Sequence, residues 1–274
     1  MSVINTNVSA LYSQNAMKTN ARHMSTAMEQ LSTGTRVNSA KDDAAGLAIG
    51  QNMTSQIRGL NMAVRNLNDG INMMQTAEGA MIEQSNMLQR MRELAVQSMN
   101  GTYSDTQRSY LDLEFQALSS QINDISTDTT WNDQTLLDDT FSPFEFQAGQ
   151  TSGQTITVTI GDMGIGSTGL DISGESIATA SDAETALSAI SDALEAINVQ
   201  RAEIGAGINR MEYAADNLTN VSSNATQSRS TIMDTDYALA TTQLAKTQII
   251  QQAATAMLAQ ANQQPQQVMQ LLKG

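Results

Sequence analysis

The fold is decided by residues 183–225, which read AETALSAISDALEAINVQRAEIGAGINRMEYAADNLTNVSSNA. Apolar side chains recur there at alternating steps of four and three residues, so they form one stripe along a helix. The stripe consists of Ala183, Leu187, Ile190, Leu194, Ile197, Ile204, Ile208, Met211, Ala215, Leu218 and Ala225, with Arg201 and Ser222 as polar exceptions. A pattern sustained over this length predicts a long coiled-coil helix from about residue 182, with Ser181 as its N-cap.

The N-terminal half carries two further helical patterns. Residues 44–99 keep one apolar column of the heptad throughout, but the second column is interrupted. The interruptions are Glu78, Ser85 and Arg92. This half-kept pattern suggests a helix that changes packing partners midway. Ser104 and Gln107 then form a capping-box pair, which predicts a third helix reaching about residue 127.

The segment between these helical halves has a different character. Phe144–Gln147 and the run from Thr155 to Ile160 alternate polar and apolar residues, which is typical of strands. We therefore expect a small β-hairpin within about residues 140–177. The sequence GDMGIG at 161–166 follows the second strand, but it lacks the spacing and the lysine of a phosphate-binding loop. We expect it to be a flexible surface loop.

The composition narrows the possible functions. A net charge of −14 disfavours nucleic acid as a partner, because phosphate binding needs clustered lysine and arginine, and it makes copies of the chain repel one another. The chain has no cysteine, which excludes disulfides and thiolate chemistry. No run approaches the ~18 apolar residues of a membrane helix. The start, MSVINTNVSALYSQNAMK, lacks the regions of a secretory signal peptide. We expect neither a nucleic-acid nor a membrane partner.

The two ends of the chain share one property. Residues 3–33 and 236–274 are helical in pattern but poor in charge and thinly apolar. The N-terminal stripe is Met17, Ala21, Met24, Met28 and Leu31, preceded by Ile4, Val8 and Leu11 in another register. The C-terminal set is Leu239, Leu244, Ile250, Ala254, Met257, Leu258 and Ala261. We infer that the ends fold against each other and against neighbouring copies. A heterologous contact between copies that does not close into a ring gives a helical filament.

Several blocks of the sequence resemble bacterial flagellins. They are LSTGTRVNSAKDDAAGLAIG at 31–50, QTAEGAM at 75–81, LQRMRELAVQSMNGT at 88–102 and FEFQAGQTSGQTITVTI at 144–160, followed by two C-terminal stretches at 197–224 and 230–272. The resemblance covers nearly the whole chain in order. It implies a mainly α fold: a long-helix coiled-coil bundle with a small β-hairpin, whose terminal helices pair into an inner domain.

The resemblance also implies a domain layout and partners. Residues 1–42 and 233–274 would form the inner coiled-coil domain, and 43–232 a helical rod, without the variable outer domains of longer members. Family members are exported through the type III apparatus of the flagellum, without a cleaved signal peptide, and they meet an export chaperone, a cap protein and hook-junction proteins. The expected inner-domain assembly residues are Ile4, Val8, Leu11, Met24, Met28, Leu31, Leu244, Ile250, Met257, Leu258, Leu271 and Leu272.

The block at residues 88–97 is a candidate contact site. With Leu88, Met91 and Ala95 facing inward, a helix of 100° per residue turns the charged side chains outward, with Leu94 beside them. In flagellins this block binds a Toll-like innate-immune receptor of animals and also contacts the next subunit. The matching residues are Gln89, Arg90, Glu93, Leu94, Gln97 and, on the neighbouring helix, Glu114. The alternative is an ordinary solvated helix face.

Two other functions compete with that of a filament subunit. A hook–filament junction protein would resemble flagellin at both ends but match less well at 88–102 and 255–272. An enzyme is disfavoured because the chain has no His-Glu-x-x-His motif, and we expect no cofactor and no metal. The single histidine, His23, lies in the N-terminal helix without an acidic cluster, so we expect it to make a polar contact between helices.

Overall fold

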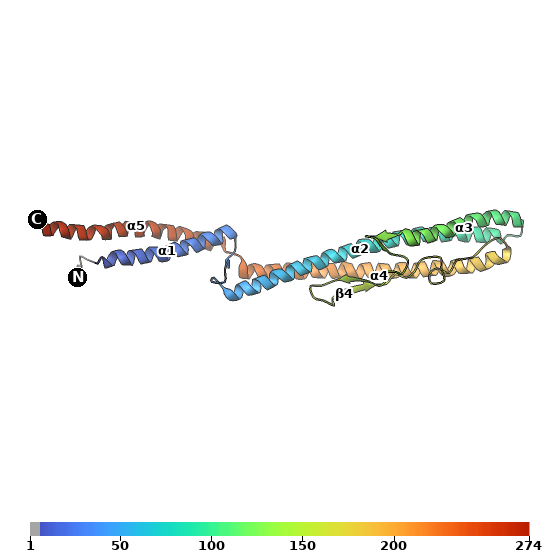
Figure 1. Ribbon diagram of the computed structural model, residues 1–274, viewed down its shortest axis with the longest axis horizontal. Coiled ribbons are helices and arrows are strands. Elements are labelled where there is room, and N and C mark those ends of the chain that lie inside the picture. The colour runs from blue at the N-terminus through green and yellow to red at the C-terminus, as the bar shows by residue number, and fades with distance from the viewer. Residues whose placement is uncertain (1–5, 274) are drawn as a thin grey trace. The chain divides into compact units, whose positions relative to one another are not determined.

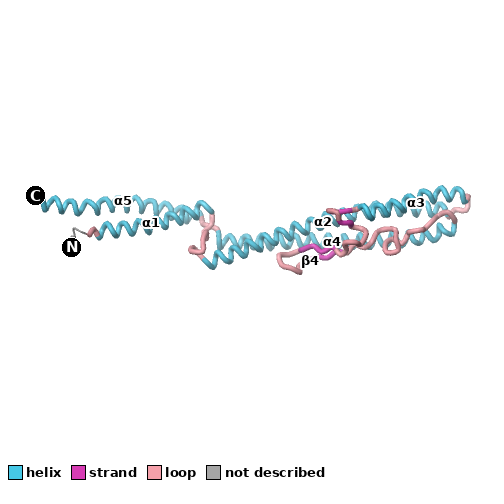
Figure 2. Tube along the Cα trace, viewed as in Figure 1, coloured by secondary structure: helices cyan, strands magenta, loops and turns pink. Residues whose placement is uncertain are grey.

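The computed structural model describes residues 6–273, with side chains described as far as residue 263. It divides into two compact units, one formed by Met1–Ile57 with Ser223–Gly274 and the other by Arg58–Ser222. Both are built mainly from long helices, as expected from the heptad patterns (Figures 1 and 2). Among the predicted assembly residues, Ile4 lies outside the described residues, and so do the side chains of Leu271 and Leu272.

Three helices have local sequence signals that explain where they begin. α2 (Ala44–Ser98) is capped by Asp43, whose Oδ1 accepts a hydrogen bond from the backbone N–H of Gly46 at 2.8 Å. α3 (Asp105–Asp128) begins with the predicted capping box, which is confirmed. α4 (Ala180–Met233) is capped by Thr179, whose Oγ1 accepts from the N–H of Asp182 at 3.1 Å. The expectation of Ser181 as the cap is wrong, since the capping residue lies two positions earlier and Ser181 is already inside the helix.

The strands form two small antiparallel pairs. β3 (Phe144–Gln147) pairs with β4 (Thr155–Val158), with Phe144 opposite Val158, so the predicted hairpin is confirmed. β1 (Thr130–Trp131) and β2 (Gln134–Thr135) form a second, two-residue hairpin that was not predicted. Its turn is made by two residues with positive φ, 51° and 62°, at Asn132 and Asp133, which suits a tight hairpin.

The second unit has one continuous apolar core. α2, α3 and α4 contribute to it, and so does the segment between α3 and α4, of which Leu136, Leu137, Ile160 and Ile172 are fully buried. Its largest fully buried side chains are Leu67, Met74, Met81, Leu88, Met91, Leu94, Phe115, Ile122, Leu136, Leu137, Ile160 and Ile172. In α4 the column of Ile190, Ile197, Ile204 and Met211 is buried as predicted, whereas Leu187, Leu194, Ile208 and Leu218 are only half-buried.

Burial on α4 extends instead to a column that the heptad pattern does not mark: Ala186, Ala193, Gln200 and Gly207. The connecting segment explains this shift, because it packs on that side of the helix. The side-chain amide of Gln200 makes two hydrogen bonds to the backbone of this segment. Its Oε1 accepts from the N–H of Gly161 at 3.1 Å, and its Nε2 donates to the carbonyl of Thr159 at 2.9 Å. The expectation of a flexible loop at 161–166 is therefore wrong, since Met163 and Gly164 are buried against the helices.

In the first unit, α1 (Val8–Thr33) packs along α5 (Tyr237–Lys273), which agrees with the predicted pairing of the terminal helices (Figure 1). The buried side chains of α1 are Ala10, Asn20 and Ala27, flanked by half-buried Met17, Met24 and Leu31. The predicted column containing Ala21 and Met28 faces outward, so that part of the expected stripe is wrong. A sequence reading based on apolar residues misses Asn20, which is buried because α5 supplies its hydrogen-bond partners.

Candidate assembly and receptor-contact surfaces

The block at residues 88–97 projects an ion-paired surface from α2. Leu88, Met91 and Ala95 are fully buried, as predicted. Arg90 faces out; its Nε donates to Oε1 of Glu114 on α3 at 2.9 Å, and its NH1 donates to Oε2 of Glu93 at 2.9 Å. These bonds, to Glu114 first and then to Glu93, raise the pKa of Arg90 above its usual value. The guanidinium thus connects α2 to α3 and fixes the position of two carboxylates.

Two glutamines extend this surface along α2. The Nε2 of Gln97 donates to the hydroxyl of Tyr103 at 2.9 Å, and Gln89 lies one turn before Glu93 and is exposed. Sequence reasoning missed Tyr103, because it stands in the turn between α2 and α3, outside any helical stripe. The structure therefore brings together Gln89, Arg90, Glu93, Gln97 and Glu114 on one exposed face.

Leu94 does not belong to this face. Its side chain is only 1% exposed and is part of the apolar core, so the expected outward orientation is wrong. The buried face of α2 is wider than the assumed stripe, because helices and the connecting segment pack on it from more than one side. Leu94 supports the surface from beneath rather than presenting its side chain to a partner.

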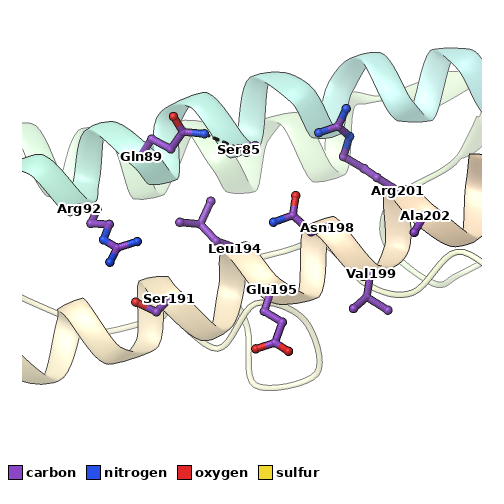
Figure 3. A pocket seen from close by; sticks show the side chains of 10 residues that line it. All are labelled: Ser85, Gln89, Arg92, Ser191, Leu194, Glu195, Asn198, Val199, Arg201 and Ala202. Carbon is purple, nitrogen blue, oxygen red and sulfur yellow. Dashed lines mark hydrogen bonds between the residues drawn. The ribbon is translucent and has the colours of Figure 1, made fainter.

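A polar groove lies between α2 and α4 (Figure 3). It contains the interruptions of the α2 heptad column at Ser85 and Arg92, and Arg201 of α4. Arg201 lies 3.6 Å from Glu78 through its NH2, while its Nε is buried without a hydrogen-bond partner among the described residues. The interrupted column thus marks the place where α2 and α4 leave an open groove instead of an apolar seam.

The paired terminal helices leave many large apolar side chains exposed. On α1 these are Val8, Leu11, Tyr12 and Met28, and on α5 they are Tyr237, Leu239, Ile249, Ile250 and Met257. Leu239 is 71% exposed and Met257 64% exposed. Five predicted assembly residues, Val8, Leu11, Met28, Ile250 and Met257, belong to this set, whereas Met24, Leu31, Leu244 and Leu258 are half-buried between the helices. Tyr12 and Ile249 were missed because they lie outside the expected stripes.

The described residues offer little for other kinds of site. No group of three or more His, Asp or Glu side chains among them could hold a metal ion. His23 is exposed on α1, so the expected contact between helices is wrong. No helix within the described part of the chain is long and apolar enough to cross a membrane.

Comparison with known proteins agrees with this arrangement. Residues 4–142 match the bacterial flagellin N-terminal helical region, and residues 187–272 match the bacterial flagellin C-terminal helical region. The chain is 44% identical to a flagellin of Halalkalibacterium halodurans over 271 residues, covering 99% of this chain and 100% of the relative. It is 40% identical to a flagellin of Bacillus subtilis over 302 residues, covering 98% and 99% of the two chains.

Two solved structures share the fold. The crystal structure of Bacillus cereus flagellin aligns with a TM-score of 0.50 at 30% identity, covering 56% of this chain and 88% of that one. A flagellar hook-associated protein from Vibrio parahaemolyticus aligns with a TM-score of 0.59 and covers 70% and 99%, but at 15% identity it shares the fold alone. The chain therefore belongs to the bacterial flagellin family, and it is a structural, non-enzymatic subunit of the flagellar filament outside the cell.

Proposed function

We propose that the terminal helices carry the polymerisation contacts of this subunit, with residues 1–42 and 233–274 as the inner domain and 43–232 as the rod. The observation that supports this is the apolar surface left on α1 and α5 after they have packed on each other. Fully burying one such side chain contributes about 1.5–3 kcal/mol. Several of them together can outweigh the repulsion between copies that each carry a net charge of −14.

Polar substitution of the exposed residues tests this proposal. We expect the double variant Ile249→Asn, Met257→Gln to elongate far more slowly, because both side chains are exposed on α5 and would lose apolar burial on assembly. Filament length and number are measured by electron microscopy after seeding. The matched control is Leu113→Asn on α3, where the side chain is 68% exposed. Normal filaments from the double variant would rule out these contacts.

We also propose that the exposed face formed by Gln89, Arg90, Glu93, Gln97 and Glu114 binds a Toll-like innate-immune receptor when the subunit is free. Support comes from the family match of this block and from the two ion pairs of Arg90, which hold the charges in a fixed arrangement. Exposed ion pairs add little to folding stability, so the side chains can be exchanged without unfolding the chain.

The receptor proposal is tested with soluble monomer on receptor-bearing cells. We expect Arg90→Ala to raise the concentration needed for half-maximal activation about tenfold or more, since arginine is enriched among interface hot spots. The control is Arg65→Ala, an exposed arginine of the same helix. Equal activation by the two variants, with unchanged thermal unfolding, would remove Arg90 from the contact.

The remaining partners are proposed on the basis of the same family membership. We propose export through the type III apparatus of the flagellum without a cleaved signal peptide, with a chaperone covering the C-terminal helix beforehand and with cap and hook-junction proteins meeting the subunit outside. The apolar residues exposed on α5 support the need for such a chaperone, because a free helix of this kind is prone to premature association.

A further inference from the structure

A polar layer interrupts the apolar contact between α1 and α5. Asn20 is only 7% exposed, and its Nδ2 donates both to the backbone carbonyl of Thr247 at 2.8 Å and to Oε1 of Gln251 at 3.1 Å. Thr247 is 2% exposed. Both hydrogens of the Asn20 amide therefore have acceptors on α5, and one of these acceptors is a side chain.

The apolar contacts of the two helices do not define one alignment by themselves. On α1 the inward column repeats every seven residues at Ala10, Met17, Met24 and Leu31. On α5 the inward residues Leu244 and Leu258 are two heptads apart, and Ala240, Ala254 and Ala261 are also separated by whole heptads. Along the helices, sliding one past the other by seven residues, about 10 Å, would replace one apolar neighbour by another. Such a slip would also break the bridge between Thr35 and Asp234 at the helix ends.

The polar layer distinguishes these alignments. In the observed pairing Asn20 meets Thr247, and the Nδ2 of Asn7 donates to the carbonyl of Ala261 at 2.8 Å. A slip of one heptad in either direction would place Leu244 or Leu258 where Gln251 now accepts. A backbone carbonyl could still take one hydrogen of the Asn20 amide, but the second would be buried without an acceptor, which is strongly disfavoured.

We propose that Asn20 and Gln251 select the register along the α1–α5 pair, in addition to the bridge between Thr35 and Asp234 that joins the ends of the two helices. A buried asparagine is known to fix the register of coiled coils at some cost in stability. This inference rests on the proposed role of α1 and α5 in assembly, because the register sets how the outward apolar residues align. Leu11 and Met257 lie at the same level of the antiparallel pair, and a slip would separate them by about 10 Å.

The absence of cysteine from the sequence allows a direct test in filaments. Leu244→Cys is combined with Met24→Cys, which reports the observed register, or with Met17→Cys or Leu31→Cys, which report slips of one heptad in the two directions. After mild oxidation, disulfides within one chain are scored by the shift in electrophoretic mobility. In the otherwise native chain we expect the 24–244 disulfide to dominate by about tenfold or more.

Substitution of the polar layer should redistribute these disulfides. We expect Asn20→Leu to raise the yields of the 17–244 and 31–244 disulfides at least severalfold. Gln251→Leu should raise them too, although it is the milder substitution because the carbonyl of Thr247 still accepts one hydrogen bond from Asn20. The double variant should keep or increase the helix content while losing the preference for one register. Asn15→Leu, at an exposed position of α1, is the matched control and should leave the 24–244 disulfide dominant.

The outcomes separate the register from the pairing. If 24–244 remains the dominant product in Asn20→Leu, Gln251→Leu and the double variant, the register inference is overturned. If the native chain forms none of the three disulfides, the pairing of α1 with α5 in the filament fails, and the proposed assembly role fails with it. Loss of filaments in Asn20→Leu leaves Gln251→Leu to decide the question.

Discussion

At the scale of single residues, Asp42 holds together the turn that precedes α2. Its Oδ2 accepts hydrogen bonds from the hydroxyl of Ser39 at 2.9 Å and from the backbone N–H groups of Ser39 at 3.0 Å and Asn38 at 3.3 Å. These bonds, led by the Ser39 hydroxyl, lower the pKa of Asp42 below its ordinary value. The carboxylate is therefore favoured by the folded turn.

This arrangement predicts that acid opens the turn. Because the folded-state pKa is depressed, the stabilisation is fully present above the ordinary aspartate value of about 3.9 and is lost as the pH falls through the lower folded value. We expect the amide hydrogen of Ser39 to exchange faster with solvent as the pH falls through that window, after correction for intrinsic exchange. In Asp42→Asn the same amide should show no such acid step. If Asp42→Asn kept the same acid-dependent increase in exchange, the increase would have to come from another carboxylate.

At the scale of elements, the hairpin depends on close approach to α4. A Cβ atom added to Gly207 would lie 2.9 Å from Cγ2 of Val158, a stiff and buried side chain of β4. Two residues earlier in the same helix, a Cβ added to Gly205 would meet nothing within 4 Å. The two glycines thus stand in the same secondary structure with opposite surroundings.

These surroundings predict opposite effects of the same substitution. Gly207→Ala should lower the free energy of unfolding by about 1 kcal/mol, because the cost of overpacking exceeds the gain in helix propensity. Gly205→Ala should raise it by about 0.5–1 kcal/mol, because only the gain remains. Denaturant unfolding of the monomer, followed by circular dichroism, measures both. Equal shifts in the two variants would mean that β4 does not pack on Gly207 in solution.

How far the sequence could predict these elements depends on what packs against each helix. Periodicity placed both ends of α2 and α3 and the start of α4 within a residue or two, because a sustained heptad stripe reflects the burial of one face. It misplaced Leu94 and missed Gly207, because their burial comes from long-range packing that no local period records. It misjudged α1 for a related reason, since Asn20 is polar and is buried only because α5 provides acceptors.

The candidate surfaces were predictable to different degrees. The ion-paired face around Arg90 could be found from helix geometry together with the family resemblance, and the pairing with Glu114 follows from the antiparallel approach of α2 and α3. The polar groove was visible only as an interruption of the heptad at Ser85 and Arg92, without any sign of what the gap would become. The local pattern thus marks where the apolar contact between two helices is interrupted, but it does not predict the shape of the groove that forms there.

At the scale of the whole molecule, the excess of acidic side chains opposes the self-association that the family membership requires. The chain carries 28 acidic and 14 basic residues, so every copy repels its neighbours at low ionic strength. Salt shortens the distance over which exposed charges act to about 10 Å at 0.1 M. Salt also strengthens apolar association when the ions are excluded from the surface, so the two effects must be separated.

We predict that moderate salt accelerates filament elongation mainly by screening. Light scattering after seeding should then rise faster as sodium chloride is increased to about 0.15 M, a range in which screening changes strongly. The variant Glu184→Gln, Glu212→Gln, Asp216→Asn removes three exposed negative charges from α4. It should elongate faster at low salt and depend less on added salt, because less repulsion remains to be screened. If the variant kept the full salt dependence, apolar salting-out would be the dominant effect, and slower growth of the native chain with added salt would contradict screening altogether.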